Sequence, residues 1–150
     1  MSDYFDTGVL LKLYTAEPES AAVRAFVQRR TRALPVTDLH MAECVSALRL
    51  KQFRGEASGS EAARALQLWN HDLRVGVLRL IGVDWNVVWS ECRDLADSHA
   101  SSTGCRTLDT LHIASARVLG FQRLVTSDHR QSAMAKLAGL ATIDPVTRGG

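Results

Sequence analysis

Four acidic residues, each set in an apolar stretch, are the side chains of this sequence best suited to chemistry: Asp6, Glu43, Asp109 and Asp128. An ionised carboxylate is costly to place beside core residues unless something pairs with it. Few basic residues stand next to these four acids, and a hard divalent cation prefers oxygen ligands. The pattern therefore predicts chemistry on phosphates that depends on Mg²⁺ or Mn²⁺.

Each acid also has a structural explanation. Asp6 and Asp128 precede predicted helices and could cap them, and Asp109 in a first helical turn is favoured by the helix dipole. Glu43 has apolar helical neighbours and could pair with an arginine such as Arg49. Singly these signals are weak, but together they favour a site.

The segments that must position these acids alternate between strand-like and helix-like. Short apolar runs predict strands at 3–6, 33–37, 77–83, 123–126 and 141–143. Helical spacing and terminating glycines predict the helices between them, most clearly at 38–53, 84–98, 106–119 and 129–138. Asp38 is the expected cap of the first of these helices, and Val87 is expected to face inward in the second. Strands interleaved with helices imply one α/β domain over residues 1–150, with a largely parallel sheet covered on both faces.

This order of elements predicts where the acids lie. Asp6 and Asp128 each come at the carboxyl end of a predicted strand. Glu43 lies on the helix after the second strand, and Asp109 lies near the start of the helix before the 123–126 strand. Because ligands of open parallel sheets bind outside the carboxyl ends of the strands, we expect the four acids to converge at that edge.

The composition is typical of a soluble globular protein, with 46% apolar and 23% charged residues. A formal charge of +2 does not by itself indicate binding to nucleic acid. Cys44, Cys92 and Cys105 lack C-x-x-C spacing, which argues against a disulfide framework and against a thiolate zinc site. Without a basic leader or an apolar run near the ~18 residues of a membrane span, a cytoplasmic protein is expected.

Four stretches of the sequence together resemble the PIN domain, and in particular the VapC-type toxins of bacterial toxin–antitoxin pairs. They are residues 4–14, Glu43 with 46–48, 108–116 and 125–128. The resemblance spans nearly the whole chain in order. It implies a three-layer α/β/α fold with a mainly parallel central sheet, and cleavage of RNA with Mg²⁺ or Mn²⁺.

Carried over by position, the four acids match the acidic quartet that is catalytic and binds metal in this family. Thr7 matches the hydroxyl residue after the first acid, and Thr126 matches a polar residue near the last. Gly8 departs from the family, which more often has Ser or another small polar residue there.

Other residues with possible chemistry are left out of this set. His112 lies one turn after Asp109, and the resemblance favours a buried structural histidine there. Lys12 and Arg106 are better placed to contact RNA phosphate. Core or dimer-interface packing is the favoured role of the three tryptophans, Trp69, Trp85 and Trp89.

The leading hypothesis is an endoribonuclease that hydrolyses RNA phosphodiesters by metal-activated water, and that is the toxin of a toxin–antitoxin pair. Its implied partners are RNA, a small antitoxin and a second copy of the chain. Two alternatives share the fold: a PIN nuclease of RNA processing or decay, and an RNA-binding module with little activity. A phosphoacceptor receiver domain is disfavoured because Asp6 is followed by Thr7 and Gly8 rather than by a second acid, and Asp128 by His129 and Arg130 rather than by lysine.

Overall fold

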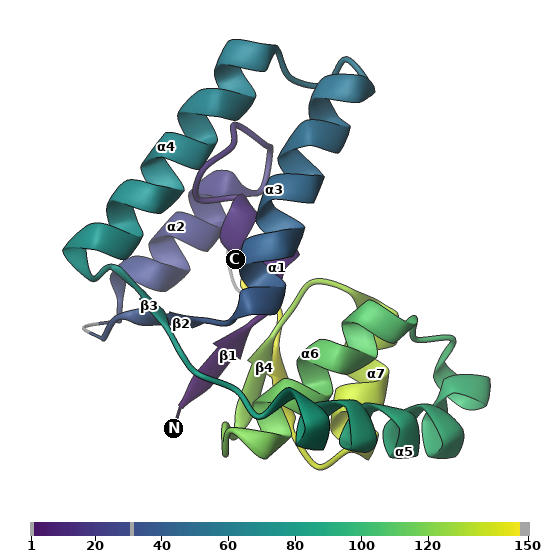
Figure 1. Ribbon diagram of the computed structural model, residues 1–150. Helices are drawn as coiled ribbons and strands as arrows, with labels where there is room; N and C mark the ends of the chain where they lie inside the picture. Colours follow the sequence, from purple (N-terminus) through teal and green to yellow (C-terminus); the bar gives the residue numbers. More distant parts are fainter. Residues whose placement is uncertain (1, 31, 148–150) are drawn as a thin grey trace. The chain divides into compact units, whose positions relative to one another are not determined.

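The computed structural model describes residues 2–30 and 32–147, in which strands and helices alternate (Figure 1). The strands are β1 (Asp3–Phe5), β2 (Leu34–Val36), β3 (Leu78–Leu80), β4 (Arg123–Val125) and β5 (Ala141–Ile143). The helices are α1 (Thr7–Leu11), α2 (Ser20–Gln28), α3 (Asp38–Phe53), α4 (Gly59–Val75), α5 (Trp85–Thr103), α6 (Thr107–Val118) and α7 (His129–Leu137). The chain divides into two compact units. The first unit consists of Met1–Val9 and Gly82–Gly150, and the second consists of Leu10–Ile81.

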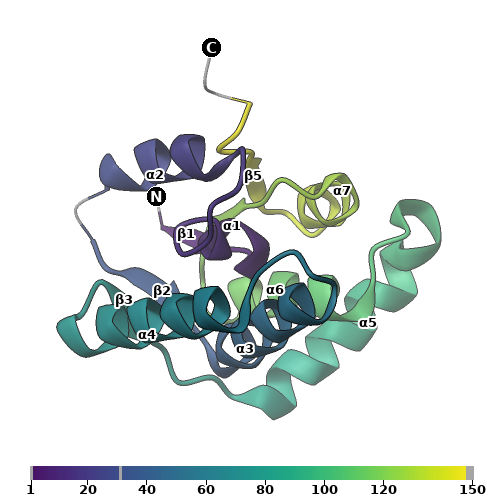
Figure 2. The same cartoon turned by 90° about the horizontal axis from the view of Figure 1, so that it is seen from above.

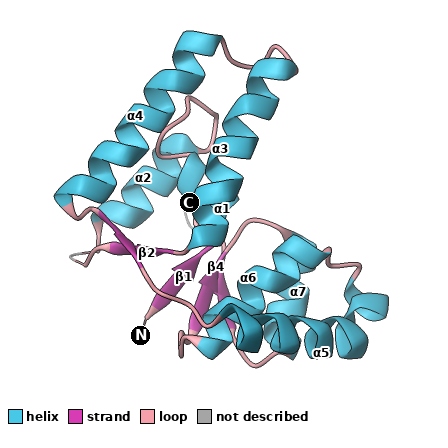
Figure 3. Cartoon of the chain, viewed as in Figure 1, coloured by secondary structure: helices cyan, strands magenta, loops and turns pink. Residues whose placement is uncertain are grey.

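The first unit contains a parallel sheet in the order β1-β4-β5. Phe5 lies opposite Val125, and Val125 lies opposite Ile143, so the carboxyl ends of the three strands are in register. Strands β1 and β4 lie side by side in Figure 3. Leu124 and Val125 are completely buried, as expected for a parallel strand covered on both faces. The predicted α/β class with parallel strands is confirmed.

Helix α6 is the central helix of the first unit. Every residue from 110 to 116 is buried, because α5 and α7 both pack against this helix (Figure 2). The buried polar residues of this run have hydrogen-bond partners, as in the contact from the Ser115 hydroxyl to the Leu111 carbonyl at 2.8 Å. A helix enclosed in this way holds its side chains in fixed positions.

The second unit pairs β2 with β3 in parallel and packs α3 against α4. Trp69 of α4 is 1% exposed, and its ring contacts that of Tyr14 edge-on. Tyr14 also donates a 2.7 Å hydrogen bond to Asp72, which ties the segment after α1 to α4. Trp69 is thus a core residue, whereas Trp89 of α5 is 46% exposed.

Local signals set most helix boundaries. Ser58 and Glu61 form a capping box at the start of α4, and Asp84 caps α5 through the amide groups of Asn86 and Val87. Gly76 and Gly104 end these helices with φ of 82° and 67°, a left-handed conformation that suits glycine.

Three local predictions were wrong. Thr37, not Asp38, precedes the first turn of α3, because its backbone amide donates to His40 Nδ1 at 2.9 Å in a capping box. Val87 is 49% exposed, since the adjacent Val88 takes the inward position. Helix α5 continues beyond residue 98 to Thr103, where Gly104 supplies the left-handed end.

The three cysteines are free and buried. Among the helices that the structure describes, none combines the length and the apolar character that crossing a membrane requires.

Candidate functional site

Asp6 and Asp128 follow neighbouring strands of the first unit. The amide of Asp6 donates to the Val125 carbonyl at 3.0 Å, so Asp6 directly continues the pairing of β1 with β4. Asp128 comes three residues after β4 and begins α7. Both residues therefore lie at the carboxyl edge of the sheet, as their positions in the sequence predicted.

Asp128 is the N-cap of α7. Its Oδ1 accepts a 2.8 Å hydrogen bond from the amide of Gln131, and the residue is exposed to solvent. Asp128 therefore has the helix-capping role that its position before a predicted helix suggested. A capping carboxylate at a solvent-facing edge keeps its charge accessible to a ligand.

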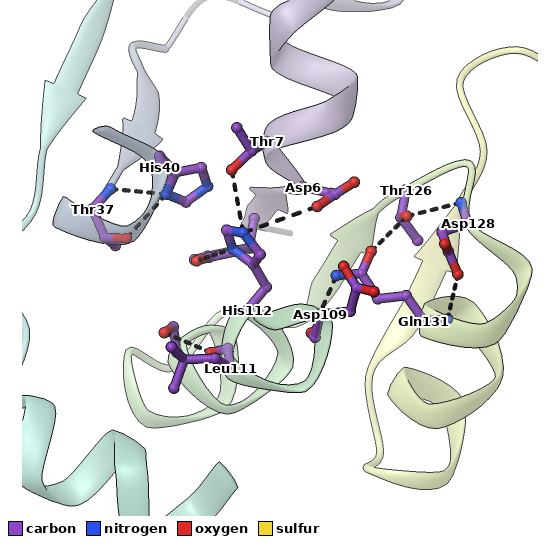
Figure 4. Close-up of polar contacts among 12 residues, drawn as sticks. Asp6, Thr7, Thr37, His40, Asp109, Leu111, His112, Thr126, Asp128 and Gln131 are labelled. Atoms are coloured by element: carbon purple, nitrogen blue, oxygen red, sulfur yellow. Dashed lines mark hydrogen bonds and ion pairs between the residues drawn. The ribbon is translucent and has the colours of Figure 1, made fainter. Parts of the chain in front are cut away.

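Asp109 lies in the first turn of α6, near Asp128. Burial raises the pKa of the Cys105 thiol, and the charges of Asp109 and Asp128 raise it further against the opposing effect of the Thr110 hydroxyl. Both carboxylates therefore lie close enough to the Cys105 thiol to affect its pKa. In addition, Gln131 donates from Nε2 to the Asp109 carbonyl at 3.2 Å, which links the starts of α6 and α7 (Figure 4).

His112 connects Asp6 to the core of the first unit. The ring is completely buried, with Tyr4 Oη 2.8 Å from Nδ1 and Thr7 Oγ1 3.2 Å from Nε2. The same Nε2 lies 4.0 Å from Asp6 Oδ1. The predicted burial of His112 is confirmed, and Thr7 is a partner of this ring (Figure 4).

Gly8 leaves space beside the Asp6 carboxylate. A Cβ at this position would lie 3.1 Å from Asp6 Oδ2, which is closer than an ordinary contact. A larger residue here would require the Asp6 carboxylate to shift by a few tenths of an ångström.

Glu43 lies on α3 and belongs to the second unit. Its side chain is partly buried, next to Cys44, whose thiol pKa burial raises to about 12. Because Glu43 lies in the interior of α3, its carboxylate does not cap this helix.

The chemistry of the donors fits a hard divalent cation, because all four acids offer carboxylate oxygens and none is fully buried. Within residues 2–30 and 32–147, however, no three His, Cys, Asp or Glu side chains form a group that could hold a metal ion. The first unit contains Asp6 and Asp128 at the carboxyl edge of its sheet and Asp109 in the first turn of α6, and Glu43 is described with the second unit. The role of all four in binding metal stays a prediction.

Sequence reasoning missed two polar residues of this region, Tyr4 and Gln131. Tyr4 reads as a strand residue, and nothing in its neighbours indicates the contact with His112. For Gln131 a signal was present, because Asp128 followed three residues later by glutamine has the spacing of a capping box.

Comparisons with known proteins agree with this architecture. A family model described as the PIN domain matches residues 4–137, a range that includes parts of both units. Ribonuclease VapC46 of Mycobacterium tuberculosis is 37% identical over 145 residues, covering 95% of this chain and 96% of that protein. The crystal structure of FitAcB from Neisseria gonorrhoeae has a similar fold, with a TM-score of 0.64, 15% identity and coverage of 95% of this chain and 97% of that one.

Proposed function

This chain belongs to the PIN domain family, and from that premise we propose that it is a divalent-metal-dependent endoribonuclease. The observation that carries the proposal is that Asp6 and Asp128 follow the paired strands β1 and β4, while the main chain of Asp109 is hydrogen-bonded to Gln131, three residues after Asp128. The similarity to a protein named as a ribonuclease, over nearly the full length of both chains, supports RNA as the substrate.

Asp6, Glu43, Asp109 and Asp128 would hold the metal, with Thr7 and Thr126 as supporting polar residues. A divalent cation bound there supplies Lewis acidity and lowers the pKa of a water molecule, so that phosphodiester hydrolysis proceeds at neutral pH. The carboxylates also repel RNA phosphate in the absence of an opposing charge. Metal and substrate therefore bind cooperatively in this proposal.

We further infer that the protein is the toxin of a toxin–antitoxin pair, acting in the cytoplasm as a homodimer and inhibited by a small antitoxin protein. The name VapC46 of the similar ribonuclease and the match across 96% of its length support this inference. Together, both compact units would then make up one PIN-like domain.

The activity is tested by incubating purified protein with total RNA in the presence of Mg²⁺, Mn²⁺ or a chelator. We expect discrete fragments with either metal, none with the chelator, and a loss of at least about 100-fold in rate for Asp6→Asn. Asp97→Asn is the matched control, because Asp97 is an exposed aspartate of α5 in the same unit. If folded protein without a bound inhibitor left the RNA uncut with both metals, the result would favour the alternative of an RNA-binding module with little activity.

The toxin role is tested by inducing the gene in bacteria. We expect the wild type to arrest growth and Asp6→Asn to have no such effect. Co-expression of a neighbouring small gene should restore growth. RNA cleavage in vitro without any effect on growth would instead favour a nuclease of RNA processing or decay.

A further inference from the structure

Gln131 is a polar side chain of α7 with no exposed surface. Its Oε1 accepts a 2.7 Å hydrogen bond from the Thr126 hydroxyl, and its Nε2 donates to the Asp109 carbonyl at 3.2 Å (Figure 4). A buried amide is costly unless both of its ends are bonded, and here both ends are. The amide therefore spans from the end of β4 to the first turn of α6.

The orientation of this amide is determined by its partners. The Thr126 hydroxyl accepts from the amide of Asp128 at 3.0 Å and donates to Gln131 Oε1. A main-chain carbonyl can only accept, so the Asp109 carbonyl requires the NH₂ end. Flipping the amide would turn its oxygen toward the Asp109 carbonyl and break that bond.

Gln131 occupies the third position of its helix, where the side chain of a capping box normally binds the N-cap amide. His40 in α3 and Glu61 in α4 make that contact at the equivalent position. In α7 the Thr126 hydroxyl binds the N-cap amide instead. The side chain of Gln131 is thereby released from a role in its own helix and reaches α6.

We propose that Gln131 is a positioning residue that holds the Asp109 and Asp128 carboxylates in the relative arrangement a divalent cation needs. One end of its amide binds the main chain of Asp109, and its backbone amide binds Asp128 Oδ1 at 2.8 Å. The inference rests on the proposed function. Because its side chain is completely buried, Gln131 would act through these two residues and not by contact with the cation.

The first test measures Mn²⁺ binding by titration calorimetry for the wild type and for Gln131→Met, which keeps the volume and removes both side-chain bonds. We expect Mn²⁺ affinity to fall about 10–100-fold, as for other residues that orient metal ligands. Ser115→Ala is the matched control, because it removes a buried hydrogen bond at the other end of α6. It should lower thermal stability in chelator while leaving Mn²⁺ affinity unchanged.

Gln131→Asn is a second variant, since it keeps the amide but is too short to reach both partners. Wild-type Mn²⁺ affinity in either folded variant would overturn the inference while the proposed function stood. Absence of Mn²⁺ binding and RNA cleavage in the wild type would overturn both.

A readout on the metal-free wild type remains decisive even if neither variant folds. The bridge predicts that the side-chain NH₂ protons of Gln131 exchange with solvent far more slowly than those of exposed Gln67 and Gln122 in NMR spectra. Equal exchange rates would show that the amide is not held, and the inference would be wrong.

Discussion

Burial determines the chemistry available to single residues in this protein. Burial raises the pKa of the thiols of Cys44, Cys92 and Cys105. A protonated thiol is neither a good nucleophile nor a good metal ligand at neutral pH. The three thiols are therefore not expected to bind a cation.

A pH dependence of stability follows for Cys44. Its folded-state pKa of about 12 exceeds the ordinary value of 9.0, so the folded protein binds more protons between these values. Its contribution is fully present below pH 9 and is lost as the pH rises, with the free energy of unfolding falling by up to about 1.4 kcal/mol per pH unit. Urea denaturation across this range should show a steeper fall for the wild type than for Cys44→Ala. An equal dependence of the free energy of unfolding on pH in the two proteins would contradict the raised pKa of Cys44.

At the scale of elements, the helix starts show how one local signal can serve different purposes. Helix α4 begins with a complete capping box, in which the amide of Glu61 donates to Ser58 Oγ at 3.1 Å. Helix α7 has the same spacing between Asp128 and Gln131, but only half of the reciprocal contact. The first arrangement stabilises a helix, and the second joins two helices.

Removing the α4 cap should therefore affect stability alone. Ser58→Ala is expected to lower the free energy of unfolding by about 1 kcal/mol, because the Glu61 amide loses its acceptor. Ser90→Ala, an exposed change in the interior of α5, should alter it by less than about 0.5 kcal/mol. Denaturant midpoints of the two variants give the comparison, and equal midpoints would contradict a stabilising cap. Mn²⁺ affinity should be unchanged in both.

At the scale of the molecule, the edge that carries Asp6 and Asp128 is built from distant parts of the sequence. Strand β1 pairs with β4, and the hydrogen bond from the Asp6 amide to the Val125 carbonyl at 3.0 Å continues this pairing to the edge. The edge therefore exists only when the first unit is folded. A cation that binds there must stabilise the folded state.

Metal addition should consequently raise the melting temperature. At a free Mn²⁺ concentration about 100 times its Kd, linkage contributes about 2.7 kcal/mol. For a protein of this size that corresponds to a rise of roughly 5–10 °C. A chelator should reverse the rise, Asp6→Asn should abolish it and Asp97→Asn should retain it. An equal rise in Asp6→Asn would exclude Asp6 as a ligand.

Elements with strong local signals agreed closely between sequence and structure. The predicted 123–126 strand and 106–119 helix each lie within one or two residues of β4 and α6, because a buried apolar run and a following Gly120 mark them. Boundaries decided by side-chain contacts were less accurate. Thr37 rather than Asp38 precedes α3 because His40 folds back onto its amide, a geometry that residue types alone do not specify.

The sequence by itself determined the α/β class, the order of the elements and the identity of the acids at the strand ends, since these depend on periodicity and on neighbours along the chain. Only the tertiary structure decided which polar groups meet: His112 with Tyr4 and Thr7, and Gln131 with Thr126 and Asp109. Such pairs join residues up to 108 positions apart. A buried polar group is costly without a hydrogen bond, and the groups that can bond to it are those that the fold places beside it.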